Sequence, residues 1–181
     1  MFKRFTNSEI SSASQVKSSV QRGIRAKIVE QYPALEEEID EILPKKSDFV
    51  VARCPNHVQL ICHGGKPLFF QCRDGPFFPC LRLVHQYPGC WPTMQVDLGA
   101  IPFVMGGANI MCPGFTSKGG NIPQDYEAGT AVIIMAENKK QALAVGITKL
   151  STEEIRKQKR GIGVDNVHYL NDGLWLTQTI D

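Results

Sequence analysis

The sequence predicts an α+β protein built from two small domains. Apolar residues recur every fourth position from about Ser14 to Gln31, as in an amphipathic helix, and short strand-like runs replace this period from Phe49 onward. A segment rich in Pro and Gly, residues 88–93, then separates these elements from a second set of strands. A chain of 181 residues is long enough for one domain or for two small ones with cores of their own.

Residues 1–92 are expected to form the first domain, opening with an edge strand over Phe2–Phe5 and two helices. The apolar stripe of the first helix is Val16, Val20, Ile24 and Ile28. Basic residues lie largely off this stripe and are most simply interpreted as solvated charge. They are Lys17, Arg22, Arg25 and Lys27. Pro33 suits the first position of the second helix, whose apolar face is Leu35, Ile39, Ile42 and Leu43.

Strand-like runs follow at residues 49–51, 58–62 and 68–70. Glycines at 64 and 65 predict that the last two runs form a hairpin, and residues 81–87 predict a short helix. The domain boundary is expected near residues 91–93.

Residues 93–173 are expected to form the second domain, and residues 174–181 a C-terminal tail. Strands are predicted over 130–135, 142–148 and 164–170, with a turn at 138–140. Ser151 and Glu154 have the spacing of a capping box and predict the start of a short helix. That helix is expected to end in a basic cluster, with Gly161 as its C-terminal glycine.

The most distinctive stretch runs from Gln95 to Gly114. It predicts a strand end, a short helix, a turn at Gly106 and Gly107, and a strand that includes Cys112 and stops at Pro113-Gly114. Glycines permit positive φ and close approach of another molecule, and exposed N–H groups in such a turn accept anions. A plain helix C-cap explains the same glycines, and both interpretations are open on this pattern alone.

The order of motifs in this stretch resembles the start of a PUA domain, a small β-barrel-like RNA-binding module. These motifs are Asp-x-Gly-Ala at 97–100, Gly-Gly-Ala-Asn at 106–109 and Pro-Gly at 113–114, and the resemblance continues through 129–132, 142–146 and 159–164. Together with MFKRF at 1–5, GPFFP at 75–79 and HYLNDGLW at 168–175, they make the whole chain resemble the malignant T-cell-amplified sequence protein family. The front half of ligatin is similar.

The resemblance implies an N-terminal α/β pre-PUA domain followed by a PUA domain, and a non-catalytic translation factor. Such a factor would bind the small ribosomal subunit and the tRNA acceptor end, with density-regulated protein as its partner. It would act in post-termination recycling, when deacylated tRNA is released, and in translation reinitiation. The alternative is a PUA-containing RNA-binding factor of ribosome biogenesis.

The same resemblance assigns RNA contacts by matched position to the glycine turn and the strand beside it. These residues are Gly106, Gly107, Ala108, Asn109 and Met111. Candidate phosphate contacts are Lys139, Lys140, Arg156, Lys157, Lys159 and Arg160, although a solvated helix end also explains the last four. A separate platform for rRNA is expected among Lys45, Lys46, Arg53, Arg73 and Arg82. The chain has Leu98 and Pro102 where the family commonly carries basic residues.

No signature of a P-loop, zinc protease or serine hydrolase is present, so the sequence gives no positive case for an enzyme. A PUA-bearing RNA-modifying enzyme would need a catalytic domain, and the remaining 92 or so residues are few for one. Cys54 and His57 have the spacing of a zinc-ligand pair, but Cys62 and His63 would point to opposite faces of a strand. The set is therefore a ligand short unless Cys72 or Cys80 folds back, and we expect no metal and no cofactor.

Composition is that of a soluble globular protein, with 43% apolar and 21% charged residues. Residues 1–92 hold 12 Lys or Arg against 9 Asp or Glu, and residues 93–181 hold 8 against 9, so binding to RNA would depend on local patches. The N-terminus lacks a signal-peptide core, and no apolar run approaches about 18 residues. We therefore expect a cytoplasmic protein whose six cysteines are reduced.

Overall fold

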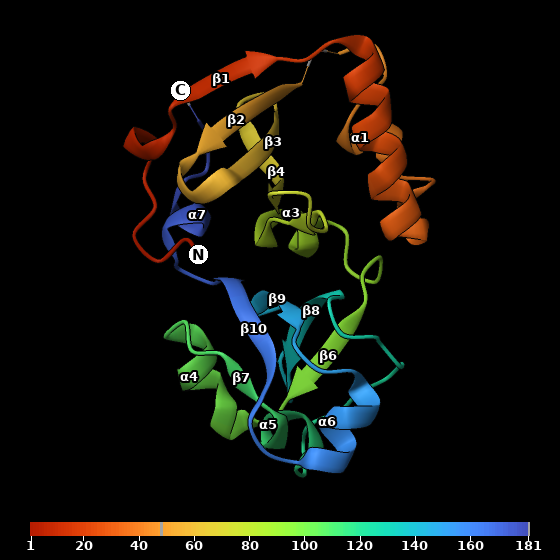
Figure 1. The fold of residues 1–181 in the computed structure, drawn as a ribbon, viewed down its shortest axis with the longest axis vertical. Coiled ribbons are helices and arrows are strands. Elements are labelled where there is room, and N and C mark those ends of the chain that lie inside the picture. Colours follow the sequence, from red (N-terminus) through yellow and green to blue (C-terminus); the bar gives the residue numbers. More distant parts are fainter. Residues whose placement is uncertain (48, 181) are drawn as a thin grey trace.

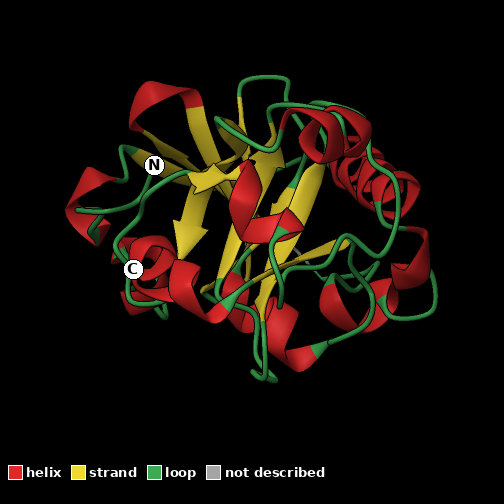
Figure 2. Cartoon of the chain, turned by 90° about the horizontal axis from the view of Figure 1, so that it is seen from below, coloured by secondary structure: helices red, strands yellow, loops and turns green. Residues whose placement is uncertain are grey.

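The computed structural model describes residues 1–47 and 49–180. The chain forms an α+β fold with two five-stranded sheets, one in each half of the molecule (Figure 1). Viewed from below, the strands occupy the middle and most of the helices lie around them (Figure 2). The predicted fold class is confirmed.

The first sheet is antiparallel throughout, with the strand order β1-β2-β3-β4-β5. Its strands are β1 (Ser12–Gln15), β2 (Val50–Cys54), β3 (Val58–His63), β4 (Lys66–Cys72) and β5 (Phe78–Pro79). Gly64 and Gly65 make the β3–β4 turn at φ values of +59° and +76°, which a residue with a Cβ rarely adopts. The predicted hairpin is thus confirmed.

The edge strand predicted over Phe2–Phe5 is wrong. These residues form a turn in which Phe5 N donates to Phe2 O at 3.1 Å, and the edge strand is β1 instead. Both rings are buried, and the Phe2 ring packs edge-on against Phe70 at 4.9 Å between centroids. Burial of both aromatic side chains therefore decides the conformation here, because a strand would have placed Phe2 and Phe5 on opposite faces.

Helix α1 (Ser18–Gln31) has a different buried face from the one predicted. Val20 is 45% exposed, whereas Gln21 and Arg25 are buried along with Ile28. Arg25 bonds Asp40 of helix α2 (Ile39–Ile42), and this bond lowers the pKa of the Asp40 carboxyl. The contact brings a cation into the buried stripe, so the interpretation of Arg25 as a solvated charge is wrong.

The remaining elements of the first domain are short. They are the 3-10 turns η1 (Asn7–Glu9), η2 (Pro33–Leu35) and η3 (Pro55–His57), and helix α3 (Leu81–Gln86). The predicted apolar face of the second helical segment is confirmed, because Leu35, Ile39, Ile42 and Leu43 are all buried.

The second sheet is a curled half-barrel with the strand order β6-β8-β9-β10-β7. Its strands are β6 (Thr93–Val96), β7 (Ile110–Met111), β8 (Ala131–Ala136), β9 (Ala144–Thr148) and β10 (Ile162–Tyr169). The β6–β8 pair is parallel, and the other pairs are antiparallel. The helical elements are η4 (Leu98–Ala100), α4 (Ile101–Met105), α5 (Cys112–Thr116), α6 (Thr152–Gln158) and α7 (Gly173–Leu176).

The structure corrects two predictions in this domain, at Cys112 and at Gly161, and confirms a third. Cys112 starts helix α5 rather than ending a strand, because Pro113 occupies the first turn, where its missing N–H costs nothing. The capping box of α6 is confirmed, with the Ser151 side chain accepting from Glu154 N at 3.2 Å. The left-handed residue at the end of α6 is Lys159, at φ +55°, and not Gly161.

Buried contacts join the two domains. Leu81 and Val84 of α3 belong to the same hydrophobic core as Ala142, Val145 and Val167 of the second domain. The last residues return to the first domain, where Gly173 N donates to Phe2 O at 2.8 Å and Ile180 N donates to Gly65 O at 2.7 Å. Residue 181 of the predicted tail lies outside the described residues.

A buried hydrogen-bond chain lies at the centre of this joint. His168 Nε2 accepts from Leu81 N at 3.1 Å, so the proton of the neutral ring is on Nδ1, which donates to Asp172 Oδ2 at 2.8 Å. Asp172 also accepts from Tyr169 N and Trp175 N, at 3.0 and 2.9 Å. The carboxylate thereby holds the end of β10, the start of α7 and, through His168, the start of α3.

Replacing His168 by Ala should lower the free energy of unfolding by about 2–4 kcal/mol, because Leu81 N–H loses its acceptor and a buried carboxylate loses a donor. Urea unfolding of the full chain measures this loss. Gln178→Ala, at an exposed position of the C-terminal segment, is the control and should change stability little. Equal stability of the two variants would contradict the role assigned to His168.

Candidate nucleic-acid interface

The glycine turn after α4 is a complete helix C-cap. Gly107 has φ +89°, its N–H donates to Val104 O at 3.0 Å, and Ala108 N donates to Phe103 O at 3.0 Å. This pair of bonds is the Schellman motif. Gly106 N donates to Pro102 O, also at 3.0 Å. The C-cap interpretation of these glycines is therefore correct.

The alternative interpretation, an anion-accepting turn with exposed N–H groups, fails for a simple reason. The N–H groups of Gly106, Gly107 and Ala108 all point back at carbonyls of α4 and are already bonded. No donor of these three residues is left for a phosphate. Any contact with RNA must come from side chains and from the outer surface of the turn.

The two glycines differ in what surrounds them. A Cβ on Gly107 would lie 2.9 Å from Cε1 of Tyr169 and 3.0 Å from its Cζ, closer than packed atoms allow. A Cβ on Gly106 would lie 3.4 Å from Pro102 O, which is a tight contact but not a collision. Position 107 therefore requires glycine, because of its positive φ and because of the Tyr169 ring. Gly106 is the exposed glycine of the pair.

An exposed apolar surface lies beside the turn. Phe103 of α4 is 70% exposed, Met111 of β7 is 49% exposed, and Leu98 of η4 is 46% exposed. Pro102 and Ala108 are also exposed, whereas Val104 faces the core. Bare aromatic and apolar side chains of this kind provide a surface on which unpaired bases stack.

Phe103 was not among the residues assigned to RNA by the sequence. The available signal was that a five-residue helix, Ile-Pro-Phe-Val-Met, is apolar on every side, so some of its residues had to face solvent. Which residue does so depends on how the helix packs, and Val104 is the buried one.

Asn166 of β10 holds the turn in place. Its side-chain Nδ2 donates to Val104 O at 3.2 Å and to Ala108 O at 3.1 Å, and its backbone N donates to Asn109 Oδ1 at 3.0 Å. The carboxamide oxygen of Asn109 is thus engaged within the protein. This latch, which the sequence did not predict, fixes the position of Phe103 relative to the sheet.

The basic cluster at the end of α6 divides into two pairs. Arg156 bonds Asp125, which lowers the pKa of that carboxyl, and Lys157 bonds Glu153 at 2.9 Å. Lys159 and Arg160 form no ion pair with any residue that the structure describes. The last two charges are therefore the ones available to a phosphate.

The charges available to a phosphate lie near the two ends of the apolar surface. Met111 pairs with Ile162, and Cys112 N donates to Gly161 O at 2.8 Å, so the chain just after Lys159 and Arg160 adjoins β7. At the other end, Leu98 N donates to Glu137 Oε2 at 3.2 Å, which places the exposed turn with Lys139 and Lys140 beside η4.

The five residues of the expected rRNA platform do not form one group. Arg53 and Arg73 line a common hollow of about 610 Å³ with His57. Lys45 lies in a different hollow with Arg25, Lys46 is exposed near it, and Arg82 lies on α3 against Trp175. Arg53 and Arg73 are therefore the pair that the fold brings together.

All six cysteines lie in the described residues, and none of them forms a disulfide. Burial raises the pKa of Cys54 to about 11 and of Cys62 to about 12, so both are protonated at neutral pH. Within residues 1–47 and 49–180 no three His, Cys, Asp or Glu side chains are grouped to hold a metal ion.

Over the part of the chain that the structure describes, no helix combines the length and apolar character that a transmembrane segment needs.

The fold and the turn define a two-domain PUA protein. Residues 5–88 match the Pre-PUA-like domain family, and residues 92–170 match the PUA domain family. The chain is 52% identical to the malignant T-cell-amplified sequence 1 homolog of Drosophila melanogaster, over 99% of this chain and 100% of the relative. It is 48% identical to human malignant T-cell-amplified sequence 2, over 99% of both chains. The chain therefore belongs to the malignant T-cell-amplified sequence family, as its motifs predicted.

Other comparisons agree. Translation machinery-associated protein 20 of Saccharomyces cerevisiae is 50% identical over 97% of both chains. Among solved structures, a hypothetical protein of Pyrococcus horikoshii has a TM-score of 0.75 at 23% identity, covering 92% of this chain and 99% of its own. A PUA domain protein of Aeropyrum pernix has a TM-score of 0.67 at 24% identity, covering 93% and 91%. The two structures support the fold alone.

Gly107→Ala should destabilise the protein by about 1–3 kcal/mol, because it places a Cβ at positive φ and against Tyr169. Gly106→Ala, one residue earlier in the same cap, should change stability by less than about 1 kcal/mol. Chemical denaturation of both variants measures the difference. A Gly107→Ala protein as stable as Gly106→Ala would show that the turn is not held as described.

Proposed function

We propose that this protein is a non-catalytic translation factor that binds single-stranded RNA through the surface formed by Phe103, Met111 and Leu98. The observation that carries the proposal is the Phe103 ring, 70% exposed on a helix whose C-cap is rigidly bonded. Membership of a family with a PUA domain supports it, as does similarity to a relative named for the translation machinery.

An unpaired end suits this surface better than a duplex does. Bases that are free of a helix can stack on the Phe103 ring and contact Met111, whereas paired bases bury their faces. Lys159 and Arg160 at one end, and Lys139 and Lys140 at the other, then reach the phosphates of the same strand. The family resemblance implies the acceptor end of tRNA, which is an unpaired end of this kind and is the proposed ligand.

The wider role follows from the family resemblance. The protein would bind the small ribosomal subunit in the cytoplasm, pair with density-regulated protein, and act in release of deacylated tRNA and in reinitiation. Arg53 and Arg73 lie in one hollow, which Asp74 also lines, and are the pair of the expected platform best placed to contact an rRNA phosphate together. The high pKa values of the buried thiols support the absence of nucleophilic catalysis.

A ribosome-biogenesis factor would use the same PUA surface, so the turn alone does not separate the two roles. Sedimentation of cell extracts does: the proposed factor migrates with mature small subunits, and co-migration with large-subunit precursors would support the alternative instead.

Phe103→Ala should weaken binding of deacylated tRNA by about 5- to 150-fold, the effect of losing about 1–3 kcal/mol of stacking. Fluorescence anisotropy with labelled tRNA measures it. Leu176→Ala is the matched control, because Leu176 is 68% exposed on α7 of the C-terminal segment. Unchanged affinity in a folded Phe103→Ala protein would remove the central support of the proposal.

Replacing Lys159 and Arg160 by Ala should flatten the dependence of tRNA affinity on salt, by about 0.7 in the log–log slope for each lost single-strand phosphate contact. The control replaces Arg156 and Lys157 by Ala, because Asp125 and Glu153 already neutralise these charges. Equal slopes for the two double variants would indicate that the whole cluster is a solvated helix end.

A further inference from the structure

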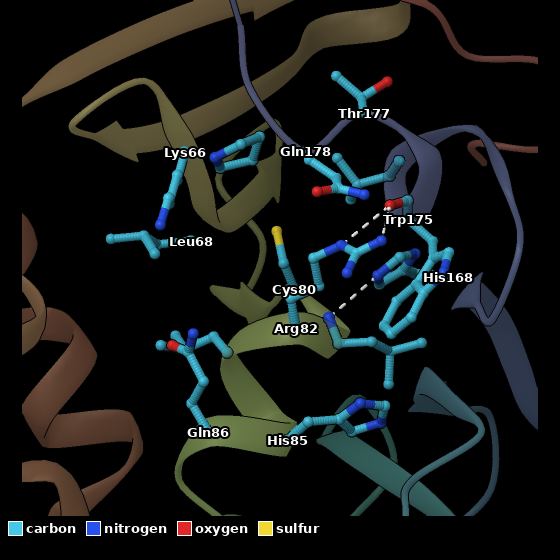
Figure 3. A pocket seen from close by; sticks show the side chains of 14 residues that line it. Lys66, Leu68, Cys80, Arg82, His85, Gln86, His168, Trp175, Thr177 and Gln178 are labelled. Carbon is cyan, nitrogen blue, oxygen red and sulfur yellow. Dashed lines mark hydrogen bonds between the residues drawn. The ribbon is translucent and has the colours of Figure 1, made fainter.

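A further hollow lies at the joint between the two domains, apart from the surface around Phe103. It is a hollow of about 300 Å³ between β4, α3 and the C-terminal segment (Figure 3). Fourteen described residues line it, and none of them is an Asp or a Glu. Lys66 and Arg82 are its two full cations, and His85, Gln86 and Gln178 add further polar groups.

The guanidinium of Arg82 is held in place without an anion. Its Nε and Nη2 donate to Trp175 O at 3.1 and 2.9 Å, and its Cζ lies 4.0 Å from the centroid of the Trp175 ring. A carbonyl dipole and an aromatic face orient the cation but do not cancel its charge. Arg82 makes no ion pair with any described residue.

Lys66 adds a second charge to the same wall. It is the first residue of β4, it is exposed, and it too forms no ion pair within the described residues. Lys66 and Arg82 lie on either side of Cys80 in Figure 3. Burial raises the pKa of the Cys80 thiol, so this side chain supplies no compensating negative charge at neutral pH.

The rest of the wall is apolar. Leu68, Leu83, Leu174 and the Trp175 ring face the hollow beside the polar groups. A volume of about 300 Å³ is at the lower end of the range for small-ligand sites, so the hollow suits a small molecule better than a stretch of polynucleotide. A short body that carries one charged group fits both the size and the mixed chemistry.

We propose that this hollow binds a small organic anion. Arg82 binds its phosphate or carboxylate group, Lys66 on the other side of Cys80 adds positive charge to the same hollow, and a short apolar body packs on Leu68, Leu83 and Leu174. A free small molecule and an acidic side chain of a bound peptide present the same chemistry to these residues. The proposal is independent of RNA binding, because none of the lining residues belongs to the surface around Phe103.

Occupancy would strengthen the joint between the domains. The wall combines β4 and α3 of the first domain with His168 of β10 and with four residues of the C-terminal segment, Leu174, Trp175, Thr177 and Gln178. A ligand that contacts all of these parts favours the state in which the segment is docked, and therefore raises the melting temperature. The hollow thus offers a place where a small anion stabilises the arrangement of both domains.

The test titrates the full chain with phenyl phosphate while the methyl signals of the lining leucines are followed by NMR. Inorganic phosphate is a control that carries the anionic group without the apolar ring. Benzyl alcohol is a control that carries an apolar ring without the anionic group. We expect saturable shifts with phenyl phosphate, weaker binding of the other two, and a higher melting temperature with phenyl phosphate. Lys66→Gln should weaken the affinity for phenyl phosphate about tenfold. Lys17 is an exposed lysine that precedes helix α1, and Lys17→Gln should leave this affinity unchanged.

A parallel titration uses an acetylated tetrapeptide containing Glu and its Gln-containing counterpart. Tighter binding of the Glu peptide than of phenyl phosphate assigns the site to a partner's side chain, and the reverse order assigns it to a free molecule. Failure of both to give saturable shifts would overturn the proposal, as would equal affinities of Lys66→Gln and Lys17→Gln proteins with matching spectra. Unchanged tRNA binding by Lys66→Gln keeps this result separate from the RNA-binding proposal.

Discussion

The bonds from Asp172 through His168 to Leu81 are the constraint on which the arrangement of the molecule depends. They join the last strand of the second domain to the first turn of a helix in the first domain, inside the core shared by both. Each donor at this point has one acceptor, and burial makes the loss of either partner costly. The domains are therefore fixed relative to one another by a specific chain of hydrogen bonds as well as by the apolar contacts of a shared core.

The same strand also contacts the proposed RNA-binding surface. His168 faces the first domain, while its neighbour Tyr169 faces the second, because successive side chains of a strand alternate. The Tyr169 ring is the surface against which Gly107 packs, and Asn166 bonds both sides of the same turn. Residues 166–169 therefore help to position both the domain joint and the proposed platform for RNA.

Local patterns were enough to predict much of the fold, including the Gly64–Gly65 hairpin, the Ser151 capping box and the family itself. The errors arose where a distant partner decides the outcome. Arg25 is buried because Asp40 lies opposite it, and Phe2–Phe5 forms a turn because its rings pack on Phe70 and on each other. At the candidate site, the sequence marked the glycine turn but not which face of α4 is exposed, since that depends on how Val104 packs.

The bonded cap also changes the physical basis of recognition in the proposed function. A turn whose N–H groups are all hydrogen-bonded cannot donate to a phosphate. The same bonds hold the Phe103 ring in position before a base binds, so little entropy is lost on binding. Leu98 and Pro102 add exposed apolar surface, so apolar contact area rather than charge surrounds Phe103. Binding energy that comes from stacking is insensitive to salt, whereas phosphate contacts weaken steeply with it. The surface is thus built to hold the faces of unpaired bases, with charge confined to its two ends.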